Sequence, residues 1–297
     1  MVRFIPGEVI PRRIERTVPS YLATYLSNVS IMRYIDTHTH IDCPDFDADR
    51  GKVIASAKSV GVERMLVMGI TESNWDRLWQ LVLSDQALSG AFGLHPIYLD
   101  EHRDEHINQL QNRLASLAGH PQCCAVGEIG LDYFLPQLDR ERQQTLLEAQ
   151  LRLASDFDLP VLLHVRRAHA PMVATLKRFR LKRAGIVHAF AGSREEAREY
   201  IKLGFKLGLG GAATWPQAKR LRRTLSELPL ASLVLETDAP DMSPSFNAYQ
   251  RNRPDLLPEI CRQLAELRGE PAEVLAQACF DNSCELFGWS STERQVW

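Results

Sequence analysis

Short apolar runs recur along the chain from Met32 onward, and each has the length of one buried β-strand. Eight such runs can be distinguished, at residues 34–37, 64–69, 90–94, 123–127, 160–163, 185–187, 205–209 and 233–236. The stretches between them are longer and have the mixed apolar and charged pattern of amphipathic helices. Eight strands that alternate with helices over about 250 residues are typical of a (β/α)8 barrel. The pattern therefore predicts an α/β protein with a single TIM barrel.

The helix predicted after Asp139 has the clearest amphipathic pattern. Its apolar residues recur every three or four positions in a stripe of Leu146, Ala149, Leu153 and Phe157, flanked by Leu147, Leu151 and Ala154. Another helix is predicted to begin after Ser193, a favourable N-cap, and to stop before Gly204. Gly61 is expected to end an earlier helix in the same way. These start and stop signals agree with the alternation of strands and helices.

A doubly wound open sheet is the alternative architecture. No GxGxxG turn follows the first strand, which a nucleotide-binding fold of that type would favour. Histidines and carboxylates that are able to bind a metal or take part in catalysis also follow at least five different strands. Only a closed barrel brings so many strand ends together, so the barrel is the favoured prediction.

Residues 1–31 differ from the rest of the chain, because they contain three prolines and only a short stretch that favours a helix. We predict an N-terminal extension at 1–31, outside the core, and one (β/α)8 barrel domain at 32–297. Translation from an upstream start and an extension that packs on the barrel are the two explanations for this segment.

Composition and charge narrow the possible functions. The formal net charge of −2 provides no overall attraction to nucleic acid, so any such contact needs a local basic patch. The six cysteines contain no CxxC pair, which predicts free thiols. No apolar run approaches the ~20 residues that span a bilayer, and no signal-peptide pattern begins the chain. We therefore expect a cytoplasmic protein with no membrane contact and no obligate protein partner.

Potential metal ligands follow five of the eight strands. In Asp36-Thr-His-Thr-His40, the two histidines are two positions apart and so point to the same side of a strand. The full set of candidates at strand ends is His38, His40, Glu128, His164, His188 and Asp238. Four imidazoles and two carboxylates exceed one tetrahedral set and suit two divalent ions that share a carboxylate. We predict a water between the two ions that attacks as hydroxide, with Asp238 as general base.

Further residues are candidates for binding a substrate. His95, at the end of the third strand, is placed to hydrogen-bond a phosphate oxygen or a leaving group, or else has a structural role. Arg166 follows the ligand His164, and a guanidinium matches phosphate oxygens well. Trp215 either stacks a base or packs in the protein, and the basic residues at 219–223 either face solvent or guide a nucleic-acid backbone. Cys43 is a weaker candidate for a metal ligand.

From Met32 to about Trp289, the chain resembles the TatD family of metal-dependent deoxyribonucleases, which belongs to the amidohydrolase-like barrels. Within that family it is similar to a bacterial branch described only as hydrolases. The motifs that carry the resemblance lie at residues 35–42, 93–96, 126–132, 159–167, 187–193 and 235–240. The resemblance implies one ion held by His38, His40 and Asp238, and a second held by His164 and His188. It also implies that Glu128 bridges the two ions and that Asp238 is the general base.

The expected function is a divalent-metal-dependent hydrolase, specifically a deoxyribonuclease that acts on DNA ends or single-stranded DNA. Zn, Mn, Mg and Ni all suit the ligand set. Three departures from the family pattern, at Val165, Ala191 and Asp241, lie near the expected mouth of the barrel and concern the substrate. Two alternatives stay open: hydrolysis of an ester or amide bond in a small molecule, and a metal-binding barrel without turnover.

Overall fold

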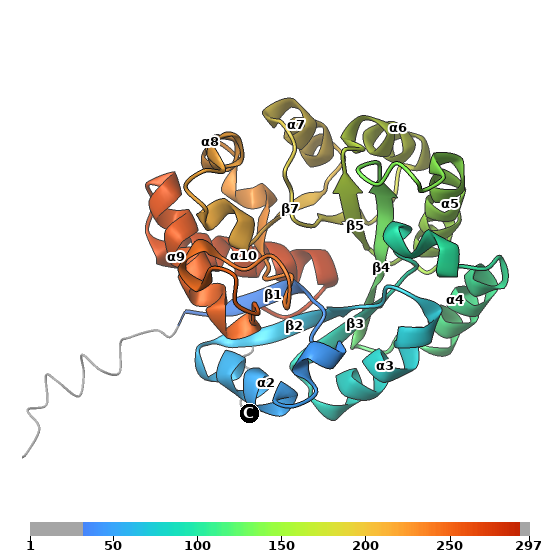
Figure 1. The fold of residues 1–297 in the computed structure, drawn as a ribbon, viewed down its shortest axis with the longest axis horizontal. Helices are drawn as coiled ribbons and strands as arrows, with labels where there is room; N and C mark the ends of the chain where they lie inside the picture. The colour runs from blue at the N-terminus through green and yellow to red at the C-terminus, as the bar shows by residue number, and fades with distance from the viewer. Residues whose placement is uncertain (1–31, 292–297) are drawn as a thin grey trace, which may run out of the picture. The chain divides into compact units, whose positions relative to one another are not determined.

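Eight parallel strands form a ring around one axis in the computed structural model, which describes residues 32–291 (Figure 1). Each strand pairs with its neighbours in chain order, and hydrogen bonds from His40 N to Ala239 O and from Asp238 N to His38 O join the first strand to the segment after the last. The strands are β1 Tyr34–Thr39, β2 Val62–Met68, β3 Leu88–Phe92, β4 Cys123–Asp132, β5 Val161–Arg166, β6 Gly185–Val187, β7 Lys206–Leu209 and β8 Leu233–Leu235. The predicted (β/α)8 barrel is confirmed, and the open doubly wound sheet is excluded. The predicted extension at 1–31 lies outside the described residues.

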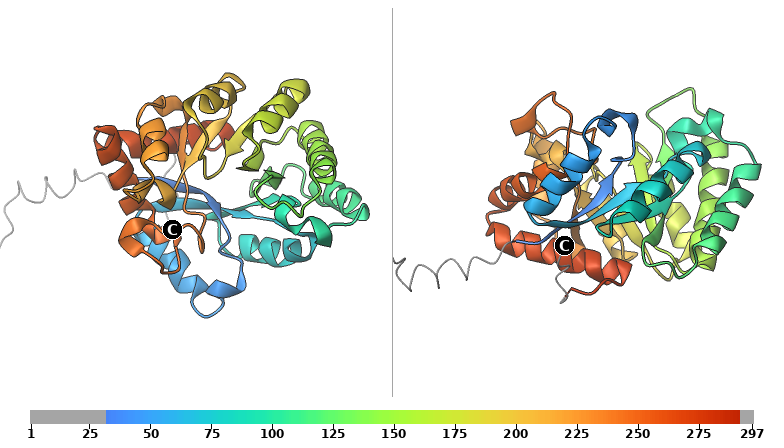
Figure 2. Two further views of the ribbon diagram at one scale, coloured as in Figure 1. Left: turned by 45° about the horizontal axis from the view of Figure 1, so that its top comes forward. Right: turned by 90° about the horizontal axis from the view of Figure 1, so that it is seen from below.

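Helices surround the ring of strands. They are α2 Arg50–Ser59, α3 Trp75–Ser84, α4 Glu105–Ser116, α5 Arg140–Asp156, α6 His169–Phe179, α7 Arg194–Lys202, α8 Lys219–Ser226, α9 Leu257–Arg268 and α10 Ala272–Phe287. α10 lies across the end of the barrel where the strands begin (Figure 2, right). Its residue Phe287 joins the apolar interior cluster formed by several strands, and Phe280 packs with Ile35 at the start of β1. The opposite end, where the strands finish, is therefore the end available for chemistry.

Three strands extend further than predicted, β1 to Thr39, β4 to Asp132 and β5 to Arg166. The last two lengthen together, because they pair through Gly130–His164 and Asp132–Arg166. The expectation that Glu128 ends the fourth strand was wrong, since Glu128 lies inside β4. The glycines at 127 and 130 misled the prediction, because glycine in a sequence commonly indicates that a strand ends. In the structure, they allow the neighbouring β5 backbone to approach closely.

The buried face of α5 is centred one residue away from the predicted stripe. Leu147 and Leu151 are fully buried, whereas Leu146 and Ala149 are partly exposed. Two glutamines also lie on the buried face, where their amides bind the backbone. Gln143 pairs with the N–H and C=O of Asp132, and Gln150 pairs with those of Leu94. α5 therefore fixes the ends of β3 and β4 from outside the barrel.

The predicted helix boundaries near Ser193 and Gly61 are confirmed. The Ser193 hydroxyl accepts from Glu196 N at 3.2 Å, and the Glu196 carboxylate accepts from Ser193 N at 2.6 Å, so the two residues form a capping box. Gly204 and Gly61 follow their helices with φ of +84° and +93°. All six cysteines are free thiols, as expected. Within residues 32–291, no helix has the length and apolarity needed to cross a bilayer.

Replacement of Gly130 by alanine is expected to lower the free energy of unfolding by about 3 kcal/mol or more. Gly130 has a φ of +155°, and a Cβ at this position would lie 1.9 Å from the carbonyl oxygen of His164. Gly51 in α2 is a matched control, because its Cβ would meet nothing within 4 Å, and Gly51→Ala should be neutral or slightly stabilising. Urea denaturation of both variants measures the difference, and equal stability of the two would contradict the prediction.

Candidate metal centre

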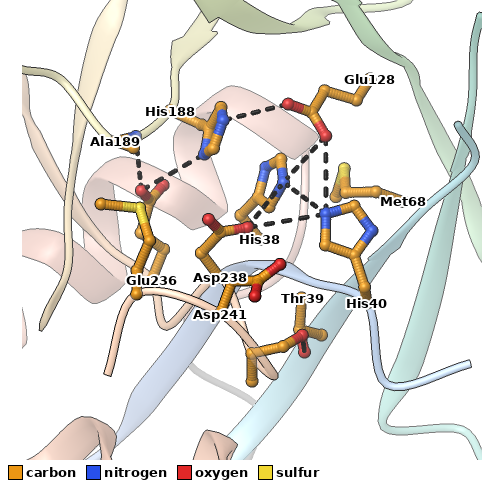
Figure 3. A network of polar contacts seen from close by, with 12 residues as sticks. His38, Thr39, His40, Met68, Glu128, His188, Ala189, Glu236, Asp238 and Asp241 are labelled. Atoms are coloured by element: carbon orange, nitrogen blue, oxygen red, sulfur yellow. Dashed lines mark hydrogen bonds and ion pairs between the residues drawn. The ribbon is translucent and has the colours of Figure 1, made fainter. Parts of the chain in front are cut away.

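The Glu128 carboxylate faces the imidazoles of His38, His40 and His188 (Figure 3). Its Oε2 lies 3.2 Å from His38 Nε2 and 3.5 Å from His40 Nε2. The other oxygen, Oε1, faces a second set of ring nitrogens at 3.0–3.3 Å, which belong to His95, His164 and His188. Each carboxylate oxygen therefore has its own group of imidazoles, as a carboxylate shared by two cations requires.

Asp238 completes the group on the β1 side. Its Oδ1 lies 3.5 Å from both His38 Nε2 and His40 Nε2. The residue has a φ of +59°, and its N–H donates to the carbonyl of His38 at 2.8 Å. This backbone contact places the aspartate beside His38 and His40.

Three groups of side chains in the described part of the chain have ligand atoms within 4.8 Å of one another and are able to hold a metal ion. They are His38–His40–Asp238, His38–Glu128–His188 and His95–Glu128–His164. The six residues predicted as ligands thus come together at one place. Cys43 belongs to none of these groups, and its sulfur lies 3.6 Å from Asp45 Oδ2 instead.

The electrostatics of the cluster favour a cation. Although burial opposes ionisation, the surrounding imidazoles hold the pKa of Glu128 well below its usual range. Burial also opposes the charge of Asp238, but its hydrogen bond with His40 and the nearby imidazoles lower its pKa. Despite the burial of His40, the carboxylates of Asp238 and Glu128 raise the pKa of its ring to about 9. The two carboxylates thus remain negative and stabilise positive charge between them.

His95 differs from the other four histidines in the hydrogen bond that its second nitrogen makes. Ile97 N donates to His95 Nδ1 at 3.1 Å, so the neutral ring carries its proton on Nε2, which faces Glu128 Oε1. Burial lowers the pKa of His95 to about 4, and the ring is therefore neutral near pH 7. A neutral N–H donor at this position suits a hydrogen bond to a substrate oxygen. The substrate role predicted for His95 stays a prediction.

Two acidic residues that the sequence reasoning did not single out orient the candidate ligands. Asp132 Oδ2 lies 3.0 Å from His164 Nε2, which leaves Nδ1 of that ring for Glu128 or an ion. Glu236 Oε1 accepts from Ala189 N at 2.6 Å and lies 3.7 Å from His188 Nδ1 (Figure 3). Carboxylates that hold the outer nitrogen of a ligand histidine fix its tautomer and orientation.

The sequence contains a signal for both of these residues. Asp132 lies four positions after Glu128 in one strand, so both point to the same face, and Glu236 lies two positions before Asp238. A third carboxylate, that of Asp36, accepts hydrogen bonds from the N–H of Thr237 at 2.9 Å and from the hydroxyl of Thr237 at 2.6 Å. This contact joins β1 to the segment that carries Asp238.

We expect Glu236→Gln to weaken metal binding about 10–100-fold, because the amide cannot fix the His188 tautomer as a carboxylate does. Asp132→Asn should act in the same way through His164. Competition with a chromogenic chelator measures the affinity, and circular dichroism confirms that the variants are folded. Glu227→Gln, on the exposed surface, is the control. If both buried variants bind metal as tightly as this control, the orienting role is wrong.

The rim of the barrel contains the remaining predicted residues. Arg166 is exposed, and its guanidinium carbon lies 3.7 Å from the ring centre of Phe134. Trp215 donates its indole N–H to Ser243 O at 2.9 Å. Lys219 and the arginines that follow it lie on α8, where Arg222 donates to the carbonyl of Ala213. No contact links these residues directly to the histidine cluster.

A (β/α)8 barrel with histidines and carboxylates gathered at the C-terminal ends of its strands defines a class, the metal-dependent hydrolases. The model of the family described as "TatD related DNase" matches residues 35–288. The chain therefore belongs to the TatD family of metal-dependent hydrolases.

Individual relatives agree with this assignment. The chain is 44% identical over 257 residues to the "Uncharacterized metal-dependent hydrolase YjjV" of Escherichia coli K12, covering 86% of this chain and 98% of that protein. It is 34% identical to the "3'-5' ssDNA/RNA exonuclease TatD" of Pantoea vagans, with 85% and 98% covered. The crystal structure of YjjV, a TatD homologue from E. coli K12, superposes with a TM-score of 0.84 at 43% identity, covering 88% of this chain and all of that chain.

Proposed function

We propose that this protein is a divalent-metal-dependent deoxyribonuclease that hydrolyses phosphodiester bonds of single-stranded DNA or DNA ends. The observation that carries the proposal is the division of the Glu128 carboxylate between two groups of imidazoles. In this proposal His38, His40 and Asp238 hold one ion, His164 and His188 hold the other, and Glu128 is shared. When bound, two divalent ions supply a water of lowered pKa and neutralise charge that develops on the phosphate.

The chain's own residues supply the proton transfer and the orientation. Asp238 is ionised near neutral pH, because the neighbouring imidazoles lower its pKa, so it is able to accept a proton from the attacking water. His95 presents a neutral N–H in the same cluster and is placed to donate to a phosphate oxygen. Asp132 and Glu236 keep the rings of His164 and His188 in position during the reaction.

The choice of nucleic acid as substrate has two supports. The relative from Pantoea vagans is named as an exonuclease of single-stranded DNA and RNA. On the rim, the exposed residue Arg166 ends β5, two positions after His164, and a guanidinium is able to pair with a phosphate. Together these favour a phosphodiester over a neutral ester or amide.

Cleavage of end-labelled oligonucleotides tests the proposal. The protein is stripped with a chelator and refilled separately with Mg, Mn, Zn or Ni, then incubated with single-stranded DNA labelled at the 5′ or the 3′ end. We expect a ladder of products that depends on the metal, and the two labels give the direction. If no metal supports cleavage although the protein binds ions, and lactones or cyclic amides are hydrolysed instead, the proposal is wrong.

A further inference from the structure

Tyr249 is an exposed aromatic side chain on the loop that follows β8. Its exposed fraction is 90%, the highest among the exposed large apolar side chains of residues 32–291. Its ring centre lies 5.7 Å from that of Trp215, with an angle of 56° between the ring planes. Met242 and Phe246, on the same loop, are also exposed, at 37% and 38%. A tyrosine with so little burial contributes little to packing, so its position on the rim calls for another explanation.

The loop between Asp238 and Arg253 holds these rings in place. Asn252 is fully buried, and its side-chain amide donates to Thr237 O at 2.7 Å and to Asp241 O at 2.9 Å. Ser245 forms two hydrogen bonds with Thr214, from its N–H at 2.8 Å and from its hydroxyl at 2.9 Å. Because Trp215 follows Thr214 directly and also binds Ser243 O, the indole and the loop form one unit. The surface is therefore formed before any ligand binds.

This pair of rings belongs to the same rim as the candidate metal centre. Trp215 follows β7, and Tyr249 follows β8, eleven residues after the candidate ligand Asp238. The loop after β8, orange in Figure 2 (right), projects at the end of the barrel opposite α10. The aromatic pair and the candidate ligands thus lie at the same end of the barrel.

A second feature of the rim indicates what the substrate contains. Arg166 and Arg167 both place their guanidinium groups over Phe134, at 3.7 Å and 4.8 Å from the ring centre. Among the described residues, neither arginine forms an ion pair, so their charges are not neutralised by a carboxylate. Arg166 ends β5 and Arg167 follows it, whereas Trp215 and Tyr249 follow β7 and β8. The rim thus combines an anion-binding element with a separate aromatic surface.

We infer that Tyr249 and Trp215 form a platform on which one nucleobase of a single strand stacks, while the strand's phosphates face the metal centre and the Arg166–Arg167 pair. Nucleic acid is the ligand that has regularly spaced anions and flat aromatic faces. In a duplex those faces are covered by neighbouring base pairs, so the platform favours single strands. The inference rests on the proposed nuclease function and adds a residue pair that determines substrate class.

The test compares Tyr249→Ala with Tyr249→Phe, which keeps the ring. Binding of a fluorescent single-stranded oligonucleotide is followed by anisotropy, in an Asp238→Asn background that prevents cleavage. We expect Tyr249→Ala to weaken binding about 10-fold and Tyr249→Phe to change it less than about twofold. A blunt duplex should bind equally to all forms. Because the side chain is exposed, neither substitution disturbs the fold.

An oligonucleotide with a single abasic nucleotide, moved along the strand, provides the second arm. When the abasic nucleotide occupies the position that stacks on the platform, the wild-type protein should bind the oligonucleotide more weakly than it binds the intact strand. Tyr249→Ala should bind the abasic and the intact strands equally. If the abasic nucleotide lowers the affinity of both proteins equally, or if Tyr249→Ala binds the intact strand as tightly as wild type, the inference is wrong. Cleavage by the wild-type protein would still support the nuclease proposal in that case. If the wild-type protein neither binds nor cleaves any oligonucleotide, both the nuclease proposal and this inference are wrong.

Discussion

Asp238→Asn is expected to reduce the turnover of a phosphodiester substrate about a thousandfold or more. The asparagine amide keeps the size of the side chain, but it cannot accept a proton and is a poorer ligand for a divalent ion. Asp238 Oδ1 lies 3.5 Å from Nε2 of both His38 and His40, so the substitution also removes a negative charge from that group. Initial rates of oligonucleotide cleavage at saturating metal measure the effect.

Asp241→Asn is the matched control for this experiment. Asp241 lies three residues further along the same loop and is exposed at the rim, and its carboxylate belongs to none of the three candidate ligand groups. We expect its turnover to change less than about threefold, since the substitution removes a charge beside the cluster but no candidate ligand or proposed base. Retention of more than a tenth of wild-type turnover by Asp238→Asn, with metal content unchanged, would exclude Asp238 as the general base.

The second large effect is expected for Glu128→Gln, which should reduce bound metal from two ions to one or none. A neutral amide cannot give one negative oxygen to each of two cations, and the imidazoles on both sides lose the charge that they share. Turnover should fall about 10,000-fold, because both proposed ions depend on this residue. Elemental analysis of the purified variant measures metal content directly and does not depend on knowing the substrate.

Removal of the Glu128 charge should also affect the metal-free protein. The carboxylate is 2% exposed, and five ring nitrogens lie within 3.5 Å of it, so the variant leaves buried imidazoles without their counter-charge. We expect the free energy of unfolding to fall by about 3 kcal/mol in the presence of a chelator. Glu236→Gln is the comparison, because that buried carboxylate lies near a single imidazole, that of His188. Two bound ions in Glu128→Gln would show that this residue is not shared.

The sequence predicted the barrel and the gathering of the six candidate ligands because both depend on local patterns. Each strand is a short apolar run, and in a closed barrel the residue type near its end is enough to name a candidate ligand. His38 and His40 needed only the alternation of a strand to be placed on one side. All six candidate ligands lie together in the structure.

Other features depend on contacts between distant segments and were not predicted. The length of β4 depends on its pairing with β5, which the glycines at 127 and 130 conceal in the sequence. Asp132 and Glu236 were visible as residues, but their partners across the mouth were not. Tyr249 lies in a loop without periodicity, and only the anchors at Asn252 and Thr214 show that this loop is fixed at the rim.

The contacts of α5 have a consequence for protein engineering. Gln143 and Gln150 hold the strand ends beside Glu128 and His95 through backbone atoms, independently of the loops after β7 and β8. Those two loops have their own anchors and are the ones that present Trp215 and Tyr249. Libraries that randomise the loop between Asp241 and Gln250 can therefore explore new substrates while the catalytic frame keeps its shape.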